Sequence, residues 1–307
     1  MRRKALLLAN ASAGQGEIRN KLFSVLVQLT RAGFEVTVCP IFPSKGITAE
    51  KFLEDCSQDY EVLLCSGGDG TLNHIVNWLL KHGRHVPVAF YPSGSTNDFA
   101  RSLGITGSAL EFCRAAAGGK AFACDAGRFN DLYFNYVAAF GAFTKVSYST
   151  DQNVKNIFGY LAYLMQGTMT LSENLGFRCR MTVTHDGQRE DGEYLFGAVC
   201  NTRFMGGMRP QLLKDAELDD GLFEVILVRA SDDLLEIPQV LGALTTGDTR
   251  NPNLRVFSAR SVSFRAEDGV DWTIDGEYGG RQTDVSIEVV PCAVTYLVSR
   301  TDINWDS

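Results

Sequence analysis

Apolar and polar positions alternate in two different ways along the chain. In roughly the first 125 residues, short apolar runs alternate with segments of helical spacing. The apolar runs predict strands over residues 4–9, 34–38, 61–65, 86–91 and 121–125. Between the first two strands a helical pattern ends at Gly33, while Ser108 and Glu111 form a capping box and Gly118-Gly119 ends the helix that follows. This alternation is typical of a parallel sheet covered by helices.

From about residue 132 the pattern changes to repeated β-type runs separated by turn residues. They predict strands over residues 178–184, 194–200, 223–229, 262–264, 272–274 and 285–290. Helical patterns interrupt them at residues 156–169 and 234–244. We therefore expect an antiparallel β-sandwich or a similar β domain. One further strand, residues 293–299, could belong to either half by pattern alone.

The length of 307 residues exceeds what one hydrophobic core usually serves, so two domains are expected. The first is an α/β domain over residues 1–128, and the second is a β-rich domain over residues 129–290. Residues 291–307 form a terminal segment that is free to return to the first domain. The predicted fold class is α/β plus all-β.

The composition and the lengths of the apolar runs disfavour several classes of function. A formal net charge of -7 disfavours a nucleic-acid partner. The apolar runs are shorter than the ~18 residues that a membrane span needs, and the apolar opening is too short for a signal peptide. The 8 cysteines form no C-x-x-C pair and the 4 histidines form no zinc pattern, as expected for buried thiols in a reducing cytosol. We expect a cytoplasmic protein.

The run Gly67-Gly68-Asp69-Gly70-Thr71 lies between the strand over residues 61–65 and a helix that opens near Leu72. Glycines allow a close approach of the backbone, and a helix N-terminus offers unpaired N–H groups, so this turn predicts a phosphate site. Asp69 would repel a bare phosphate, which indicates a divalent cation or an attacking hydroxyl between them. A simple hairpin turn is the alternative, but the flanking pattern predicts a helix rather than a second strand.

Two other loops in the first domain follow predicted strands and are rich in small polar residues. They are residues 10–16 and residues 91–101. Ligands of open α/β sheets bind beyond the carboxyl ends of the strands. The three loops therefore predict one site at one edge of the sheet.

The motifs together resemble a known family. They are residues 10–14, 67–71, 92–101 with Asn97-Asp98, 124–127, 158–164, 218–222 and 274–277. In order and spacing they resemble the soluble bacterial diacylglycerol-kinase-type lipid kinases, which are also similar to sphingosine and ceramide kinases. The resemblance covers nearly the whole chain. It implies a Rossmann-like domain of the NAD kinase and diacylglycerol kinase type, a C-terminal β-sandwich domain, ATP as phosphoryl donor and a lipid hydroxyl as acceptor.

The resemblance also implies residue roles. Phosphate and nucleotide contacts are expected from Asn10, Gly67, Gly68, Gly70, Thr71 and Thr96. Asp69, Asp98 and Asp125 would gather charge around Mg²⁺, because three carboxylates would otherwise repel one another. Glu277 follows the Asp275-Gly276 turn and is the expected general base. Asp69 is the competing candidate, and the sequence does not separate the two.

A second Mg²⁺ is implied at the Leu-Asp-Asp-Gly segment, held by the Asp220 side chain and the carbonyls of Glu217 and Leu222. A plain hairpin turn is the alternative there. Lys145 and Lys155 could face an anionic membrane or simply be solvated. Aromatic residues could line an acyl-chain groove or belong to the core, and these are Phe140, Phe143, Tyr148, Phe158, Tyr160 and Tyr163.

The leading functional hypothesis is ATP-dependent phosphorylation of a lipid hydroxyl, with diacylglycerol converted to phosphatidic acid, at the inner membrane surface. One alternative is an NAD kinase-type phosphotransferase, although the Asn-Glu pair of that family is not found. The other is a non-catalytic nucleotide- or lipid-binding regulator, although every expected acidic residue is present. The acceptor, the nucleotide preference and the oligomeric state stay open, with a homodimer among the expectations.

Overall fold

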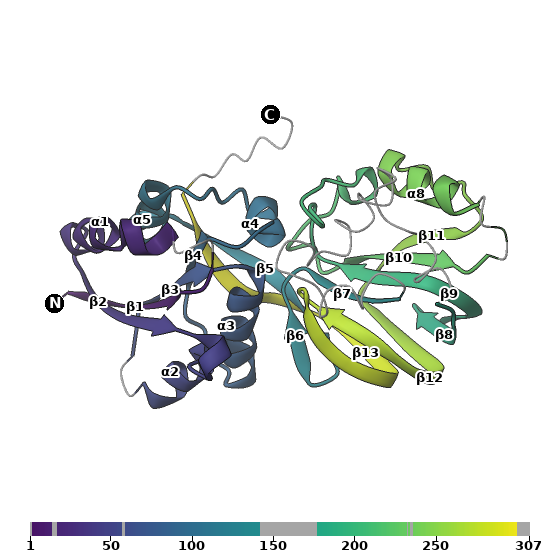
Figure 1. Ribbon diagram of the computed structural model, residues 1–307, viewed down its shortest axis with the longest axis horizontal. Helices are drawn as coiled ribbons and strands as arrows, with labels where there is room; N and C mark the ends of the chain where they lie inside the picture. Colours follow the sequence, from purple (N-terminus) through teal and green to yellow (C-terminus); the bar gives the residue numbers. More distant parts are fainter. Residues whose placement is uncertain are drawn as a thin grey trace. The chain divides into compact units, whose positions relative to one another are not determined.

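The structure is a computed structural model, and it describes residues 2–13, 17–56, 59–141, 177–231, 233 and 236–299. It divides into two compact units (Figure 1). Unit 1 comprises Met1–Cys124 and Cys292–Ser307, and unit 2 comprises Asp125–Pro291. The predicted helix over residues 156–169, the motif over residues 158–164, Lys145 and Lys155 lie outside the described residues. Of the six aromatic residues named above for an acyl-chain groove or the core, only Phe140 lies within them.

Unit 1 contains a parallel sheet. Its strands are β1 (Arg3–Asn10), β2 (Phe34–Ile41), β3 (Val62–Gly67) and β4 (Val88–Pro92). They pair in the order β4-β3-β1-β2, all in parallel. The end of β13 (Glu277–Val298) adds to the sheet beside β4, where Tyr296 pairs with Val88. The terminal strand, which the sequence pattern left unassigned, thus joins the sheet of unit 1.

Helices cover both faces of this sheet (Figure 1). They are α1 (Glu17–Arg31), the 3₁₀ helix η2 (Pro43–Lys45), α2 (Ala49–Asp55), α3 (Asp69–Lys81), α4 (Asp98–Ser102) and α5 (Ala109–Gly118). α1 and α5 lie on one face and α2 and α3 on the other. On the first face, Val25 and Leu29 of α1 and Phe112 of α5 pack with Leu7 and Leu64 of the sheet in one buried core. The α/β prediction is confirmed.

The caps of unit 1 differ in part from the prediction. Ser108 accepts the N–H of Glu111 as a capping box requires, but the Glu111 carboxylate binds the Thr106 hydroxyl instead of returning to Ser108.

The helix α2 was not predicted, because it buries only Ala49 and Leu53 and so shows little periodicity. Short helices with one-sided apolar contacts leave a weak pattern in a sequence.

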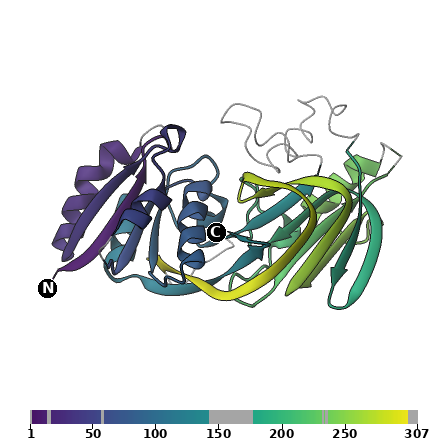
Figure 2. The same cartoon turned by 90° about the horizontal axis from the view of Figure 1, so that it is seen from below.

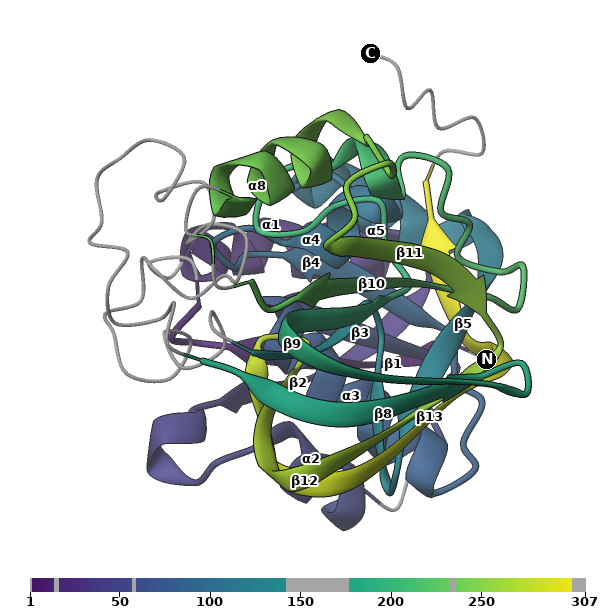
Figure 3. The same ribbon diagram turned by 90° about the vertical axis from the view of Figure 1, so that its right-hand side faces the viewer.

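Unit 2 is built from antiparallel strands. They are β5 (Lys120–Phe129, which begins in unit 1), β6 (Leu132–Phe134), β7 (Val137–Gly141), β8 (Cys179–His185), β9 (Gln188–Cys200), β10 (Phe223–Arg229), β11 (Leu254–Ala259), β12 (Ser261–Ile274) and the first part of β13. The 3₁₀ helix η4 (Gln211–Leu213) and α8 (Glu236–Thr246) interrupt them. Figure 3 shows β11, β10, β9 and β8 following one another across the unit.

The strands of unit 2 wrap around a common core. β9 and β12 each pair with β8 along one part of their length and with β7 along another. Both β12 and β13 are long and curved (Figure 2). The enclosed core contains Phe140, Phe264 and Trp272, whose rings contact one another. Phe140 is therefore a core residue, and the β-sandwich prediction is confirmed.

In two places, two segments that were predicted as separate strands form one continuous strand. Residues 262–264 and 272–274 both belong to β12, whose pairing with β13 shifts register between Arg265 and Val270. Within this irregular part, Glu267 and Asp268 are consecutive exposed polar residues, so the apolar alternation is interrupted there. Residues 285–290 and 293–299 likewise share β13.

Candidate active site

The three loops with predicted phosphate chemistry meet at one edge of the unit 1 sheet. β1 ends at Asn10, β3 at Gly67 and β4 at Pro92, and these strands are parallel neighbours. Their carboxyl ends therefore point to the same edge. β3 runs two residues further than predicted, and α3 begins at Asp69 rather than near Leu72. Asp69 is thus the first helical residue, where a carboxylate is favoured by the helix dipole.

Two of the glycines in these loops are required by the protein's own packing. A Cβ on Gly67 would lie 2.5 Å from the Cβ of Thr71. A Cβ on Gly94 would lie 2.7 Å from the Cα of Gly68, so the second and third loops touch backbone to backbone. The loops lie too close together for any larger side chain at these positions.

Asn10 connects the first loop to the second. Its side-chain amide donates to the Thr71 hydroxyl at 2.9 Å, and its side-chain oxygen accepts the N–H of Ser12 at 2.9 Å. Asn10 and Thr71 were both predicted to contact nucleotide. In the structure their side chains bind each other. A nucleotide contact from the Asn10 side chain would therefore use hydrogen-bonding capacity that its two bonds leave unused.

Asn97 shapes the third loop. It has a left-handed backbone with φ 49°, and its side chain bonds both the N–H of Gly94 at 2.8 Å and the carbonyl of Gly94 at 2.9 Å. The next residue, Asp98, is buried, and its N–H donates to the Asp69 carboxylate at 2.9 Å. The second and third loops are thus linked by a hydrogen bond from the backbone of Asp98 to the side chain of Asp69, while their shared role at Mg²⁺ stays a prediction. Gly70, in the first turn of α3, and Thr96, in the third loop, are partly exposed.

Buried polar groups lie beneath these loops. The hydroxyls of Ser66 and Ser93, at the ends of β3 and β4, are buried and have no hydrogen-bond partner within the described part of the chain. Cys65 lies just before them, and burial together with the Asp69 charge raises the pKa of its thiol far above the usual value. Cys65 is therefore an inert core thiol.

The second group of predicted residues lies in unit 2, around Asp125. Asp125 is 2% exposed, and its carboxylate accepts the N–H of Gly221 at 2.7 Å. Its own N–H donates to the carbonyl of Leu218 at 2.8 Å. The Asp220 carboxylate accepts the N–H of Leu222 at 2.9 Å. Hydrogen bonds therefore connect Asp125 with the Leu218–Leu222 turn, although the two were predicted as separate motifs.

The Asp220 turn has a further acidic neighbour that was not predicted. Burial, and then the charge of Asp220, raises the pKa of Glu224 to about 7. Glu217 and Asp220 are exposed. Over the residues that the structure describes, no three His, Cys, Asp or Glu side chains gather closely enough to hold a metal ion. A site made of one carboxylate and backbone carbonyls would not form such a group, so the second Mg²⁺ stays a prediction.

Glu277 stands directly after the hairpin turn Asp275-Gly276. It is the first residue of β13 and pairs with Ile274 across the turn. Glu277 is exposed, and its carboxylate has no hydrogen bond or ion pair with any described residue. This side chain is available to a ligand.

The chain's likeness to known proteins agrees with this arrangement. Residues 4–129 match the model of the diacylglycerol kinase catalytic domain, and residues 137–298 match that of the YegS C-terminal NAD kinase beta sandwich-like domain. A diacylglycerol kinase from Staphylococcus carnosus is 32% identical over 92% of this chain and 90% of that protein. One from Staphylococcus saprophyticus is 31% identical over 92% and 91%. The chain belongs to the diacylglycerol kinase family.

It is accordingly a lipid kinase. A crystal structure of a diacylglycerol kinase from Bacillus anthracis has the same fold, with a TM-score of 0.75 and 21% identity over 96% of this chain and 97% of that one. No helix in the described ranges is long and apolar enough to cross a membrane.

Three residues that support the site in unit 2 belong to no sequence motif and were not predicted. Asn135 and Asn201 are almost completely buried, and Glu224 is largely buried. A lone Asn or Glu carries no motif, and its burial depends on residues far away in the sequence. The Leu-Asp-Asp-Gly segment two residues before Phe223-Glu224 was the one signal that could have drawn attention to Glu224.

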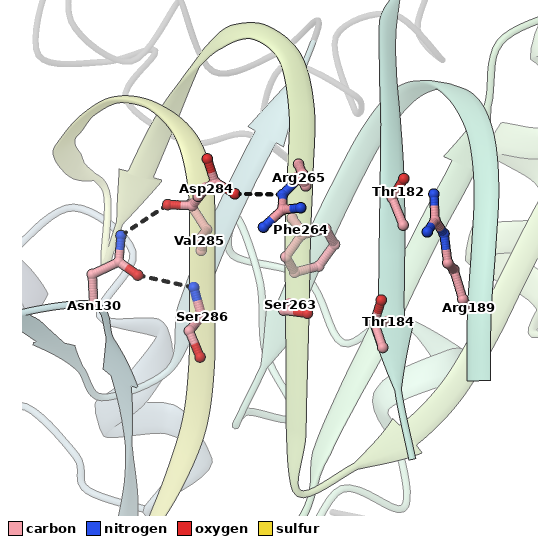
Figure 4. A pocket seen from close by; sticks show the side chains of 10 residues that line it. All are labelled: Asn130, Thr182, Thr184, Arg189, Ser263, Phe264, Arg265, Asp284, Val285 and Ser286. Carbon is pink, nitrogen blue, oxygen red and sulfur yellow. Dashed lines mark hydrogen bonds and ion pairs between the residues drawn. The ribbon is translucent and has the colours of Figure 1, made fainter. Parts of the chain in front are cut away.

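A pocket of about 390 Å³ in unit 2 lies elsewhere (Figure 4). It is lined by residues of β8, β12 and β13 together with Asn130 and Arg189, and none of them was predicted for the site. Arg265 pairs with Asp284 at 2.7 Å, and Arg189 pairs with Asp191 at 3.3 Å. Both cations are therefore paired with carboxylates, and the pocket shares no lining residue with the candidate active site.

Proposed function

We propose that this lipid kinase transfers the γ-phosphoryl group of ATP to the hydroxyl of diacylglycerol and forms phosphatidic acid. The similarity to curated diacylglycerol kinases over 92% of the chain carries this proposal. The reaction is a transfer between oxygens, so the protein's part is to position the reactants and to stabilise charge.

The phosphates of ATP would be held at the sheet edge of unit 1. The N-terminus of α3 offers backbone N–H groups. Gly68 and Gly94 lie close together beside it, and neither carries a side chain that would cover the backbone. The buried hydroxyls of Ser66 and Ser93 supply polar atoms beside these loops. These observations support an anion at this edge.

The residues also fit a bound Mg²⁺. Asp69 and Asp98 both carry a hard carboxylate, and the backbone N–H of Asp98 donates to the Asp69 carboxylate. Mg²⁺ commonly takes only one or two carboxylates and completes its shell with phosphate oxygens and water, so a cage of three acidic side chains is not required. When bound, the ion would neutralise charge on the phosphate oxygens. In unit 2, the N–H of Gly221 fixes the Asp125 carboxylate, which the family resemblance implies as a further acidic group for the reaction.

Glu277 would act as general base. It would accept the proton of the acceptor hydroxyl as that oxygen attacks the γ-phosphorus. Its exposure and its lack of a partner among the described residues support this role, because a base that is already hydrogen-bonded would have to break that bond first. Asp69 bonds the N–H of Asp98 and is better suited to hold the ion.

The direct test uses purified protein, Mg²⁺, γ-labelled ATP and phosphatidylglycerol-containing vesicles with dioleoylglycerol. We expect labelled phosphatidic acid. Parallel reactions contain monoacylglycerol, ceramide or vesicles without added acceptor, and one contains NAD in solution. Label in another lipid would reassign the acceptor, label in NAD would replace a lipid kinase by an NAD kinase, and no labelled acceptor in any reaction would refute the proposal.

A further inference from the structure

The buried carboxylate of Asp275 accepts four hydrogen bonds from residues 135–137, next to the proposed base. One oxygen accepts the N–H of Asn135 at 2.7 Å and its side-chain amide at 3.1 Å. The other oxygen accepts the N–H groups of Tyr136 and Val137, both at 3.0 Å. Asp275 is 3% exposed, and its own N–H donates to the carbonyl of Val137 at 2.8 Å. Both oxygens are thus used by one segment of unit 2.

The turn itself does not need these bonds. Unit 2 has a second Asp-Gly hairpin turn, Asp186-Gly187, with φ 48° and 76°, against 49° and 84° at Asp275-Gly276. Both pairs have the positive φ values of a tight two-residue hairpin turn. The Asp186 side chain is 58% exposed and has no backbone N–H partner in the described chain. The same turn conformation therefore forms without a buried carboxylate.

What distinguishes the Asp275 turn is the residue that follows it. Glu277 pairs with Ile274 across the turn, so the backbone that carries Glu277 moves with the turn. Since no described residue bonds the Glu277 carboxylate, its location is set by this backbone.

The segment that Asp275 binds is itself fixed on its other side. Asn201 donates its side-chain amide to the carbonyls of Asn135 at 3.2 Å and Asp125 at 3.0 Å. Its backbone N–H donates to the carbonyl of Tyr136 at 2.8 Å. Residues 135–137 therefore connect the backbone of Asp125 to the hairpin of Glu277.

We propose that Asp275 is a positioning residue for the phosphoryl transfer: its carboxylate fixes the hairpin to residues 135–137 and so sets where the Glu277 carboxylate stands. The proposal rests on the proposed function, in which Glu277 is the base. It deepens that function by assigning a role to a residue that the sequence presents only as a turn former.

The substitution Asp275→Asn tests the role of the carboxylate separately from that of the turn. Asn adopts positive φ readily, so the turn is retained. Either orientation of the new amide directs its NH₂ group at two N–H donors, which removes two of the four bonds. We expect kcat to fall about 10²-fold, as for a reacting group misplaced by about 1 Å, with KM for ATP little changed.

A double-mutant cycle with Glu277→Gln distinguishes positioning from a general loss of structure. If Asp275 acts through Glu277, then Asp275→Asn should lower the residual rate of Glu277→Gln by less than about 3-fold. The measurement is single-turnover transfer to dioleoylglycerol in vesicles. Equal losses from Asp275→Asn in both backgrounds would overturn the proposal and leave the proposed function intact.

Two control variants separate chemistry from stability. Asp186→Asn makes the same change in the matching exposed turn, and it should leave kcat unchanged. Thr273→Val removes a buried hydroxyl of β12 that bonds the carbonyl of Ala139 in the neighbouring strand β7, and it should lower the melting temperature without changing kcat. A kcat loss in either control as large as that of Asp275→Asn would contradict a specific role.

Asn135→Ala covers the case in which Asp275→Asn does not fold. It removes only the side-chain amide and leaves three of the four bonds, so its kcat loss should be smaller but equally dependent on Glu277. A loss that persists unchanged in the Glu277→Gln background would overturn the proposal. Normal activity of Glu277→Gln itself would refute the base and, with it, the positioning role.

Discussion

The two groups of candidate residues are held in place in different ways. In unit 1, consecutive residues form each loop, and the loops meet through close backbone contacts such as Gly68 with Gly94. In unit 2, side chains far apart in the sequence support the site. Asn135 and Asp275 are separated by 140 positions, and Asn201 and Asp125 by 76. The first kind of site leaves motifs in a sequence, and the second does not.

This difference has an energetic consequence. The unit 1 loops depend on the absence of side-chain atoms, so an added methyl group should disturb them. The unit 2 site depends on buried hydrogen bonds, so the loss of a donor should disturb it more than an added atom on its surface. The following variants test this contrast.

The largest effect is expected in unit 1 for Asp69→Asn. The amide keeps one oxygen to accept the N–H of Asp98, so the loop should retain its fold. Loss of the charge should lower turnover by about 10³-fold, or about 4 kcal/mol in the barrier. The rate is measured by single-turnover transfer of label, and the fold by circular dichroism.

Magnesium titration then separates the roles of Asp69 and Glu277. A metal ligand should be partly replaced at high Mg²⁺ concentration, whereas a missing base should not. We expect Asp69→Asn, but not Glu277→Gln, to recover activity as Mg²⁺ is raised. Recovery of Glu277→Gln alone would exchange the two assignments.

In unit 2, Asn201→Ala should give the largest loss of stability. It leaves the carbonyls of Asp125 and Asn135 buried without this donor, which should lower the free energy of unfolding by about 3 kcal/mol. Calorimetry measures the change. Asn77→Ala is the control, because the Asn77 amide also donates two bonds but lies partly exposed on a helix, and its loss should be much smaller.

A smaller effect is expected for Gly94→Ala in unit 1. The new Cβ would lie 2.7 Å from Gly68 and 2.8 Å from the Asn97 side-chain oxygen. Separating the loops should cost about 2 kcal/mol of stability and raise KM for ATP. Gly118→Ala is the control, since nothing lies within 4 Å and a helical alanine should be neutral or stabilising. Equal behaviour of the two variants would contradict the close-approach explanation.

The smallest effect is expected for Glu50→Gln, at a surface contact between α2 and α3. The hydrogen bond from His74, at 2.5 Å, lowers the pKa of Glu50 from 4.5 to about 2. A lowered carboxylate pKa stabilises the fold above the unfolded value, so the contribution is present above pH 4.5 and lost as pH falls through about 2.

Both side chains of this pair are partly exposed, so the loss at pH 7 should stay below about 1 kcal/mol. Melting temperatures of the native and Glu50→Gln proteins measure it across this range. The difference between them should shrink as the pH falls below 4.5. A constant difference would show that the ion pair is not its cause.

Much of the fold could be predicted because its signals are local. The strands of unit 1 are short apolar runs, and the strand-turn-helix around Asp69 is a contiguous motif, so both were predicted to within a few residues. Strand pairing was harder. β12 was predicted as two pieces, because its register shift interrupts the apolar alternation with polar residues.

The candidate site divides in the same way. The family, the two kinds of domain and the acidic residues of the motifs could be predicted from the residues alone, because they depend on short runs of fixed spacing. Only the folded chain shows that Gly94 must leave room for Gly68, that Asp125 holds the Asp220 turn, and that Asp275 is fixed by residues 135–137. Such contacts depend on the path of the whole chain, and hydrogen bonds between residues far apart in the sequence leave no local pattern to detect.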